Sequence, residues 1–469
     1  MRRYIKSNWD KLLLFFFISV YVMIFSSLSI LRHNAFASGL DLGNMDQTIW
    51  NTLNGNFFSL THDSQNVSRL AVHSDFLLIL FTPFYAVWSN PRLLLVIQSF
   101  YLGLGAIPTY LIAKLILKNR TLALGFALIY LLNPLIEWVN IFDYHTVSFL
   151  IPTFLSLFYC ALTKRWRWYW MWFTIILLIK EETALQVFLF GLTLWIVFKN
   201  KKIGIMTSLI SGVWFCFIFF VLMPAFSTTG EHWALAWYQH DGVGALMNRI
   251  LFLPEIQNYY HLLFRSFGYL PLLGLPWIFL AGPELAINAL STHSEMHSIQ
   301  YHYTSGLIPI FLIASIYGVK YFSVLFKSKS TGVSGVLVGI ALIIVLRMNY
   351  HYSPLPTTQS CWCKVYQVSD DDRTFEKLLQ AIPQDASITS STEIHAHVSQ
   401  RRESYMLPYA TSSAQYIALI DQNRIVDNYG PKPAEKELMS TLNKEGRYAL
   451  INRTGHFYLY RKINSQGLP

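Results

Sequence analysis

The feature that most constrains the fold is a series of long apolar runs in the first three quarters of the chain. Several approach the ~20 apolar residues that a helix needs to cross a bilayer. The first, residues 12–31, follows the basic start "MRRYIKSNWDK" and has no small-residue cleavage site close behind it, which favours a retained helix over a signal peptide. Only 13% of the residues are charged, against roughly 25% in soluble domains. The chain is therefore predicted to be a polytopic membrane protein.

The distribution of the basic residues, which gives the net charge of +10, is explained by membrane topology and not by a nucleic-acid-binding surface. Residues 349–469 hold 13 Lys+Arg and 12 Asp+Glu, so the basic excess lies in the apolar part of the chain. There it gathers in five segments, which the positive-inside rule predicts to be cytoplasmic. These segments are 2–11, 114–120, 164–167, 199–202 and 320–329. The N-terminus is therefore predicted to be cytoplasmic and the C-terminal part extracytoplasmic.

The apolar runs predict a mainly α fold, a transmembrane bundle of about eleven helices formed by residues 1–348. The predicted spans are 12–31, 92–117, 121–136, 145–162, 168–182, 183–198, 203–224, 256–275, 277–291, 303–325 and 332–348. The pair around Pro276 also fits a re-entrant hairpin. The first outer loop, 32–91, is too long for a bare connection, and its segment 75–88 is apolar but short, which suits a helix in the membrane interface.

Residues 349–469 are predicted to form a small extracytoplasmic α/β domain. From Asp370 onward the pattern becomes that of a soluble domain. Helices are predicted at 370–382 and 433–445, with Gly446 beyond the end of the second. Strands are predicted at 386–391, 415–421, 448–453 and 457–462.

Two acids, Asp41 and Asp46, follow the first span. Along one helix a five-residue step would turn their side chains about 140° apart, whereas Gly43 also allows a turn that brings both carboxylates together. A general base or a metal ligand is the functional interpretation. Helix capping by Asp41 and simple solvation of Asp46 explain the same residues.

Four further polar groups are predicted on the same outer face. They are His62, Asp63, His73 and Asp75; Glu137, Asp143 and His145; Lys180, Glu181 and Glu182; and Tyr301, His302 and Tyr303. The first group could bind a divalent cation, although capping of the next segment also explains Asp75. Lys180 is a candidate phosphate contact, although pairing with its glutamate neighbours also explains it. Polar residues at membranes usually face cavities, so we expect these groups to line one outer-facing cavity.

The motifs "DLGNMDQTIWNTLNG", "NPLIEWVNIFDYHTVSF", "KEETAL" and "YHYTSGLIP" resemble those of a bacterial family of uncharacterised multipass membrane proteins, known only as a domain of unknown function. The likeness extends into the tail at "IPQDASITSSTEIHAHVSQRRESYMLP". More distantly, the layout is similar to that of GT-C glycosyltransferases, which have many helices, a large first outer loop with an acidic residue and often a soluble C-terminal domain.

The GT-C resemblance implies transfer of a sugar from a polyprenyl-phosphate donor to an extracytoplasmic glycan, lipid or protein acceptor. Asp41 best matches the essential carboxylate of the first loop, and Asp46 is second. Fixed cations usually stabilise a leaving phosphate, and Lys180 is the first candidate, followed by Arg69, Arg265 and His302. His145, Glu181 and Tyr301 complete the predicted substrate-binding set. Asp41, Asp46 and His73 are the candidate ligands of a divalent cation, Mg²⁺ or Mn²⁺.

Two functions of other classes compete with this prediction. A membrane transporter or lipid flippase would use the polar residues as a path, but it usually carries charges near the bilayer midplane and often an inverted repeat. Here most acids gather at one face, no repeat is visible, and Arg265 is the main candidate for a deep charge. A non-catalytic assembly factor would display the tail but leaves the acidic outer face unexplained. All three functions place the chain in the bacterial plasma membrane, with no nucleic-acid partner.

Overall fold

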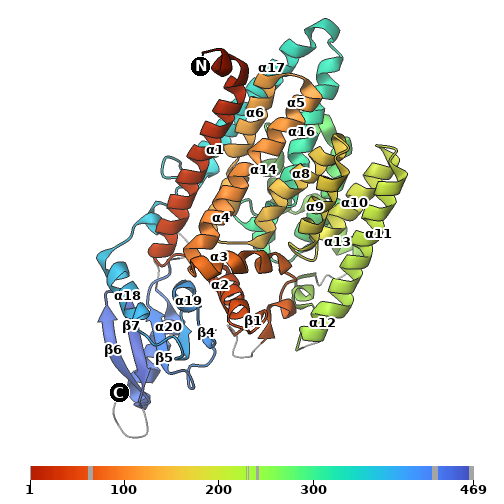
Figure 1. Ribbon diagram of the computed structural model, residues 1–469. Coiled ribbons are helices and arrows are strands. Elements are labelled where there is room, and N and C mark those ends of the chain that lie inside the picture. Colours follow the sequence, from red (N-terminus) through yellow and green to blue (C-terminus); the bar gives the residue numbers. More distant parts are fainter. Residues whose placement is uncertain are drawn as a thin grey trace. The chain divides into compact units, whose positions relative to one another are not determined.

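The computed structural model describes residues 2–61, 67–228, 230, 232–238, 242–424 and 431–463, which are mainly helical (Figure 1). The chain forms two compact units. The helical unit comprises Met1–Phe25, Ala71–Leu77 and Gln98–Cys361, and the α/β unit comprises Ser26–Leu70, Leu78–Ile97 and Trp362–Pro469. Four elements contribute residues to both units: α1 (Arg2–Asn34), η1 (Arg69–Ala71), η2 (Phe76–Phe81) and α4 (Pro91–Leu104).

The helical unit contains all the other long apolar helices. Its elements are α5 (Ala106–Leu117), α6 (Arg120–Leu131), α7 (Pro134–Ile141), η3 (Thr146–Phe149), α8 (Leu150–Leu162), α9 (Trp166–Leu177), α10 (Thr183–Ile196), α11 (Lys201–Phe217), η4 (Ile218–Leu222), α12 (Met223–Phe226), η5 (Trp233–Tyr238), α13 (Val243–Phe252), α14 (Pro254–Arg265), η6 (Leu270–Ala281), α15 (Gly282–Leu290), η7 (Ser294–His297), η8 (His302–Thr304), α16 (Leu307–Val324), η9 (Lys327–Lys329) and α17 (Ser330–Tyr352).

The central helices are buried and the outer helices expose apolar side chains, as expected for a helix bundle surrounded by lipid. Figure 1 shows α5, α6, α8 and α16 side by side in the helical unit. Most of α16 is buried, as expected for a helix at the centre of the bundle. In contrast, α11 and α17 expose large apolar side chains, among them Val213 and Ile343. Apolar surface of this extent, on helices long enough to span a bilayer, is typical of contact with lipid.

Six helical segments of the described chain are long and apolar enough to cross a membrane, or up to seven if one pair bent by 43° is a single span. The six are Asn8–Asn34, Pro91–Leu117, Lys201–Phe226, Leu270–Leu290, Leu307–Val324 and Lys327–Tyr352, and the bent pair is α6 with α7. The predicted total of about eleven is thus not confirmed. Several predicted spans correspond to helices of 12 to 14 residues, such as α8, α9 and α10.

The structure does not divide the chain at Pro276 into two spans or a hairpin. Pro276 lies inside η6, which continues into α15 as one candidate span. Proline removes a backbone donor from a helix, and the segment around it is wound as a 3₁₀-helix, which has a different hydrogen-bond pattern. The predicted span 256–275 instead includes most of α14, whose residues are on average as polar as they are apolar.

The α/β unit has one five-stranded sheet with the strand order β4-β3-β5-β7-β6. β3 pairs in parallel with β4 and β5, and β7 pairs antiparallel with β5 and β6. The elements of this unit are α2 (Leu40–Leu53), β1 (Ser59–Leu60), β2 (Val67–Ser68), η1 (Arg69–Ala71, which reaches the next unit), α3 (Thr82–Val87), η10 (Cys363–Tyr366), α18 (Asp370–Gln380), β3 (Ile388–Ser390), α19 (Thr392–Val398), β4 (Ser404–Met406), β5 (Tyr416–Ile420), α20 (Pro433–Glu445), β6 (Tyr448–Thr454) and β7 (Phe457–Lys462).

The predicted tail elements are present, and most described residues of the segment 32–91 belong to the same compact unit as the tail. Ser369 forms a capping box at the start of α18, and Gly446 ends α20 in the left-handed conformation. The core of this unit includes Phe36, which precedes α2, packed with Phe375 and Phe457. The segment 75–88, predicted to be helical, forms η2 and α3.

Gly43 is the point at which α2 approaches α19 most tightly. A methyl group there would lie 2.4 Å from His395 Cδ2 and 3.1 Å from the Ala396 nitrogen. We expect Gly43→Ala to lower the free energy of unfolding by about 1–3 kcal/mol, because overpacking outweighs the gain in helix propensity. Thermal unfolding of the purified protein measures the effect. The control is Gly339→Ala in α17, where a methyl group would meet open space. An equal change in unfolding temperature for both variants would contradict the close approach of α19 to Gly43.

Candidate functional site

Asp41 and Asp46 lie on one continuous helix, α2. The structure therefore has the helical arrangement, in which the two side chains leave the axis about 140° apart, and not the converging turn. Gly39 is the N-cap residue, so Asp41 is a first-turn acid rather than the cap. A carboxylate at this position is stabilised by the positive end of the helix dipole. This geometry does not favour one ion shared by both acids.

Asp46 is fully buried in the α/β unit and accepts three hydrogen bonds. Its donors are Tyr85 Oη at 2.7 Å, Ser399 Oγ at 2.6 Å and Gln400 Nε2 at 2.9 Å. Tyr85 belongs to α3, and the other two residues follow α19. The carboxylate therefore links three segments of this unit, and both of its oxygens already accept hydrogen bonds from side chains of the unit.

Burial raises the pKa of Asp46 to about 6 from an ordinary value of 3.8. This carboxyl thus holds its proton more tightly in the folded unit than in the unfolded chain. Its contribution to stability is fully present below pH 3.8 and is lost as the pH rises through about 6. Relative to Asp46→Asn, which does not titrate, we expect wild-type stability to fall by about 3 kcal/mol between about pH 4 and pH 7.

Unfolding of both proteins across this pH range measures the difference. Asp370→Asn, at an exposed position in α18, is the matched control and should show no such change. A difference between wild type and Asp46→Asn that is independent of pH would contradict the buried environment of Asp46.

The helical unit gathers two imidazoles around one carboxylate. Glu181, in the turn between α9 and α10, is buried, and its Oε1 accepts from His73 Nδ1 at 2.8 Å and contacts His232 Nε2 at 3.3 Å. Its Oε2 accepts from the Ser74 backbone nitrogen at 3.1 Å and from Ser74 Oγ at 3.2 Å. Three segments far apart in the sequence thus meet at Glu181. We call His73, Glu181 and His232 the imidazole–carboxylate cluster.

Lys180, the residue before this carboxylate, forms an ion pair with Glu182 Oε1 at 2.8 Å. Both side chains are mostly buried. A lysine at this depth requires a nearby anion to remain charged. The pairing fixes the ammonium group in the same short turn that carries Glu181.

His145 and His302 stack face to face, with ring centroids 3.7 Å apart. Gln98 fixes the loop that carries His145: it donates to the Asp143 carbonyl at 2.7 Å and accepts from the His145 backbone nitrogen at 2.9 Å. The Phe142 ring contacts both imidazoles and also the edge of Tyr301 at 4.7 Å. Three of the predicted residues, His145, Tyr301 and His302, are therefore positioned by contacts between rings.

His302 lies close enough to Lys180 and His73 to interact with them electrostatically. Burial first, then electrostatic interaction with His145, Lys180 and His73, holds the pKa of His302 well below its ordinary value. Two adjacent imidazolium rings would repel each other, so a neutral His302 fits the stacking. A neutral imidazole can take part in hydrogen bonds but carries no fixed positive charge.

Several of the remaining predicted residues have partners other than Glu181, His145 and His302. Glu137 accepts from Asn349 Nδ2 at 2.7 Å, and Asp75 accepts from Thr146 Oγ1. Arg69 is buried in the α/β unit. Arg265 is the last residue of α14, a helix of 12 residues that is not among the six candidate spans. His62 and Asp63 lie outside the described residues.

Sequence reasoning missed His232. It stands in "EHWALAW", between the predicted spans 203–224 and 256–275, with no acidic or basic motif of regular spacing around it. The available signal was only that it is a histidine between two apolar helices, which is weak without its spatial neighbours. Its ring stacks on Phe219 with centroids 5.0 Å apart.

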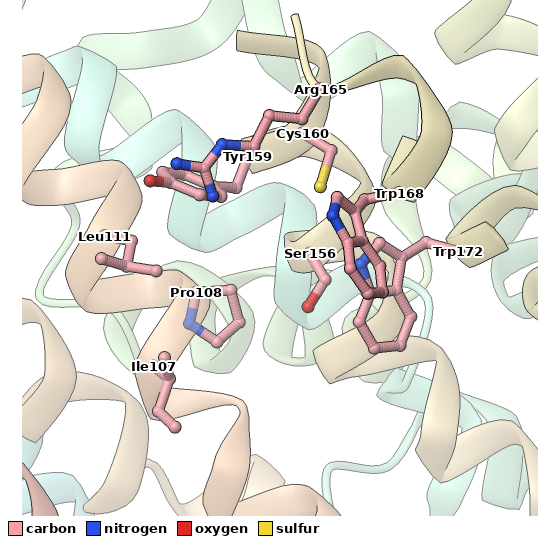
Figure 2. A pocket seen from close by; sticks show the side chains of 9 residues that line it. All are labelled: Ile107, Pro108, Leu111, Ser156, Tyr159, Cys160, Arg165, Trp168 and Trp172. Carbon is pink, nitrogen blue, oxygen red and sulfur yellow. The ribbon is translucent and has the colours of Figure 1, made fainter. Parts of the chain in front are cut away.

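A cavity of about 230 Å³ lies among α5, α8 and α9, away from these residues. Figure 2 shows its lining, in which Arg165 lies beside the Tyr159 ring and Trp168 and Trp172 both contribute indole rings. The lining is mostly apolar and includes none of the predicted site residues. This cavity is therefore not the predicted active site.

Comparison with known proteins confirms both resemblances. The profile described as "Predicted membrane protein (DUF2079)" matches residues 32–456. The crystal structure of ArnT from Cupriavidus metallidurans bound to undecaprenyl phosphate is similar with a TM-score of 0.59 and 11% identity, over 97% of this chain and 98% of that one. The apo state of the same protein gives 0.52 and 11%, over 96% and 99%. At this identity the similarity shows the fold, which is GT-C-like. No curated protein matches the sequence.

Proposed function

The chain belongs to the DUF2079 family of predicted membrane proteins, and we propose that it is a glycosyltransferase that uses a polyprenyl-phosphate-linked sugar. The observation that carries the proposal is the likeness to ArnT along nearly the whole chain, because ArnT is seen with undecaprenyl phosphate. The helical unit also supplies a lysine and stacked imidazoles, which are chemical groups that suit a lipid phosphate.

Lys180 is the proposed contact for the donor phosphate. When the bond between the sugar and the phosphate breaks, negative charge grows on the phosphate, and a fixed cation lowers the energy of that state. The ion pair with Glu182 orients the ammonium group before substrate arrives. His302, which is neutral, would donate a hydrogen bond to the phosphate. His145 would hold the His302 ring by stacking on it, and Tyr301 would support Phe142, which packs beside both imidazoles.

Asp41 is the proposed general base. It would take the proton from a hydroxyl of the acceptor while that oxygen forms a bond to the anomeric carbon. The bond from the anomeric carbon to the phosphate oxygen breaks at the same time, with inversion, and the lipid phosphate leaves as an anion. Such proton transfer requires a carboxylate within hydrogen-bond reach of the hydroxyl. The assignment rests on the GT-C resemblance of "DLGNMDQTIWNTLNG" and on the partial exposure of Asp41.

Asp46 receives a different role in this proposal. Its three donors and complete burial support a bracing role within the α/β unit. The predicted Mg²⁺ or Mn²⁺ of Asp41, Asp46 and His73 stays a prediction, and no step proposed for the reaction passes through it. Arg69 and Arg265 remain predicted phosphate contacts with no geometry in their favour.

The proposed reaction takes place at the outer leaflet. The five basic segments support a cytoplasmic N-terminus and an extracytoplasmic tail. A lipid-linked donor remains in the bilayer, which gives a reason for building the enzyme from transmembrane helices. The acceptor is then an extracytoplasmic glycan, lipid or protein.

Binding of undecaprenyl phosphate to the purified protein tests the donor class. Native mass spectrometry should show retention of undecaprenyl phosphate in the presence of excess phosphatidylglycerol. Lys180→Met should lower its occupancy, and Lys329→Met, at an exposed position in η9, should not. Equal retention of the two lipids by wild type would contradict the proposal.

A further inference from the structure

The imidazole–carboxylate cluster has the composition and spacing of a metal site. His73, Glu181 and His232 each offer one ligand atom, and these atoms all lie within 4.8 Å of one another. Both imidazole nitrogens already face the same carboxylate oxygen, at 2.8 and 3.3 Å. Distances of this size are close to the separation between neighbouring ligands around a tetrahedral ion bound at about 2.0–2.2 Å.

Other residues hold the three groups in this arrangement. Ser74 donates twice to Glu181 Oε2, which leaves Oε1 directed at the imidazoles. His232 stacks on Phe219, which orients its ring, and its Nδ1 accepts from the Ala234 backbone nitrogen at 3.2 Å. Zinc at Nε2 would move the ring proton to Nδ1, so metal binding would replace this hydrogen bond. Partners of this kind orient the ligands of metal sites and increase affinity for the ion.

The ligand types favour one class of ion. Two imidazole nitrogens and one carboxylate oxygen suit Zn²⁺, whereas Mg²⁺ and Mn²⁺ prefer mostly oxygen ligands. Three protein ligands leave the fourth tetrahedral position for water or another small ligand. We propose that His73, Glu181 and His232 bind one Zn²⁺ ion.

This proposed ion would act as a cross-link. His73 belongs to the short segment 71–77, Glu181 to the turn between α9 and α10, and His232 to the segment between α12 and α13. A metal that binds the folded state and not the unfolded chain stabilises the fold by mass action. The proposal does not depend on glycosyl transfer, and it involves neither Asp41 nor Asp46.

The alternative is a hydrogen-bonded cluster without metal, in which both imidazoles donate to Glu181. The two states differ in protonation, because a nitrogen that binds zinc carries no proton. Zinc binding should therefore weaken at acidic pH and release protons.

Metal analysis of the full-length protein tests the proposal. After chelation, dialysis and addition of ZnCl₂, the wild type should retain one zinc per chain and unfold at a higher temperature, whereas MgCl₂ should give no such shift. His232→Gln and Glu181→Gln should lose the zinc and the shift. His261→Gln, at an exposed position in α14, should keep both. Equal zinc content in wild type and His232→Gln would overturn the proposal.

A second measurement requires no variant and remains decisive where a variant does not fold. X-ray absorption at the zinc edge of the wild-type protein should show two imidazole ligands per zinc. A spectrum of oxygen ligands alone would identify an adventitious ion only and would also overturn the proposal.

Discussion

Asp41→Asn is expected to lower sugar transfer by about 10²–10⁴-fold, the range that a positioned general base contributes. Asparagine has the size of aspartate but cannot take a proton at neutral pH. The loss of a favourable helix-dipole interaction should cost less than about 1 kcal/mol of stability, because Asp41 is in the first turn of α2. Incorporation of labelled sugar into lipid, glycan and protein of cells that make each variant measures the effect.

The control is Glu437→Gln, an equally conservative change at an exposed position in α20. It should transfer sugar at the wild-type rate. Full activity of Asp41→Asn at normal expression would remove Asp41 from the mechanism and leave the role of base to another residue.

Lys180→Met should lower transfer by about 10²–10³-fold, the effect of removing one group that stabilises developing negative charge. Methionine keeps much of the side-chain length but has no charge. The rate of transfer by purified protein at saturating donor measures the loss. A change only in the donor concentration required would mean that Lys180 binds the ground state and the transition state equally.

The ion pair of Lys180 with Glu182 permits a sharper test. If Lys180 served only to neutralise Glu182, then the double variant Lys180→Met with Glu182→Gln would regain activity, because no unbalanced buried charge would remain. The proposed phosphate contact predicts that the double variant stays as slow as Lys180→Met. Recovery to the wild-type rate would contradict it.

The transmembrane class and the tail domain could be predicted because they depend on local patterns. Apolar runs, basic segments and alternating strands are properties of neighbouring residues, and the predicted strands and helices of the tail are present. In contrast, α19 and β4 were missed because both are short and α19 contains two histidines and no apolar periodicity. The number of spans also could not be derived from apolar runs, because a short apolar helix can be buried in protein instead of crossing a bilayer.

The sequence predicted some residues of the site but not their contacts, because the residues that meet are far apart along the chain. His73 and Glu181 were candidates, but their contact joins residues 108 positions apart, and no local pattern reports such a pair. The sequence suggested that Gly43 could permit a turn that brings Asp41 and Asp46 together, whereas in the fold its lack of a side chain allows the close approach of α19. For Asp46, position beside a span indicated function, and only the fold revealed the three donors around its carboxylate.

The most direct test of the proposed function is the chemical fate of the lipid-linked sugar. Purified protein in nanodiscs, supplied with polyprenyl-phosphate sugars and envelope glycans extracted from its host, should consume one donor and release an equal amount of free polyprenyl phosphate, detected by mass spectrometry. Asp41→Asn should leave that donor intact. Proteoliposomes in which the wild type moves the lipid-linked sugar across the bilayer, without ever releasing polyprenyl phosphate, would contradict glycosyl transfer.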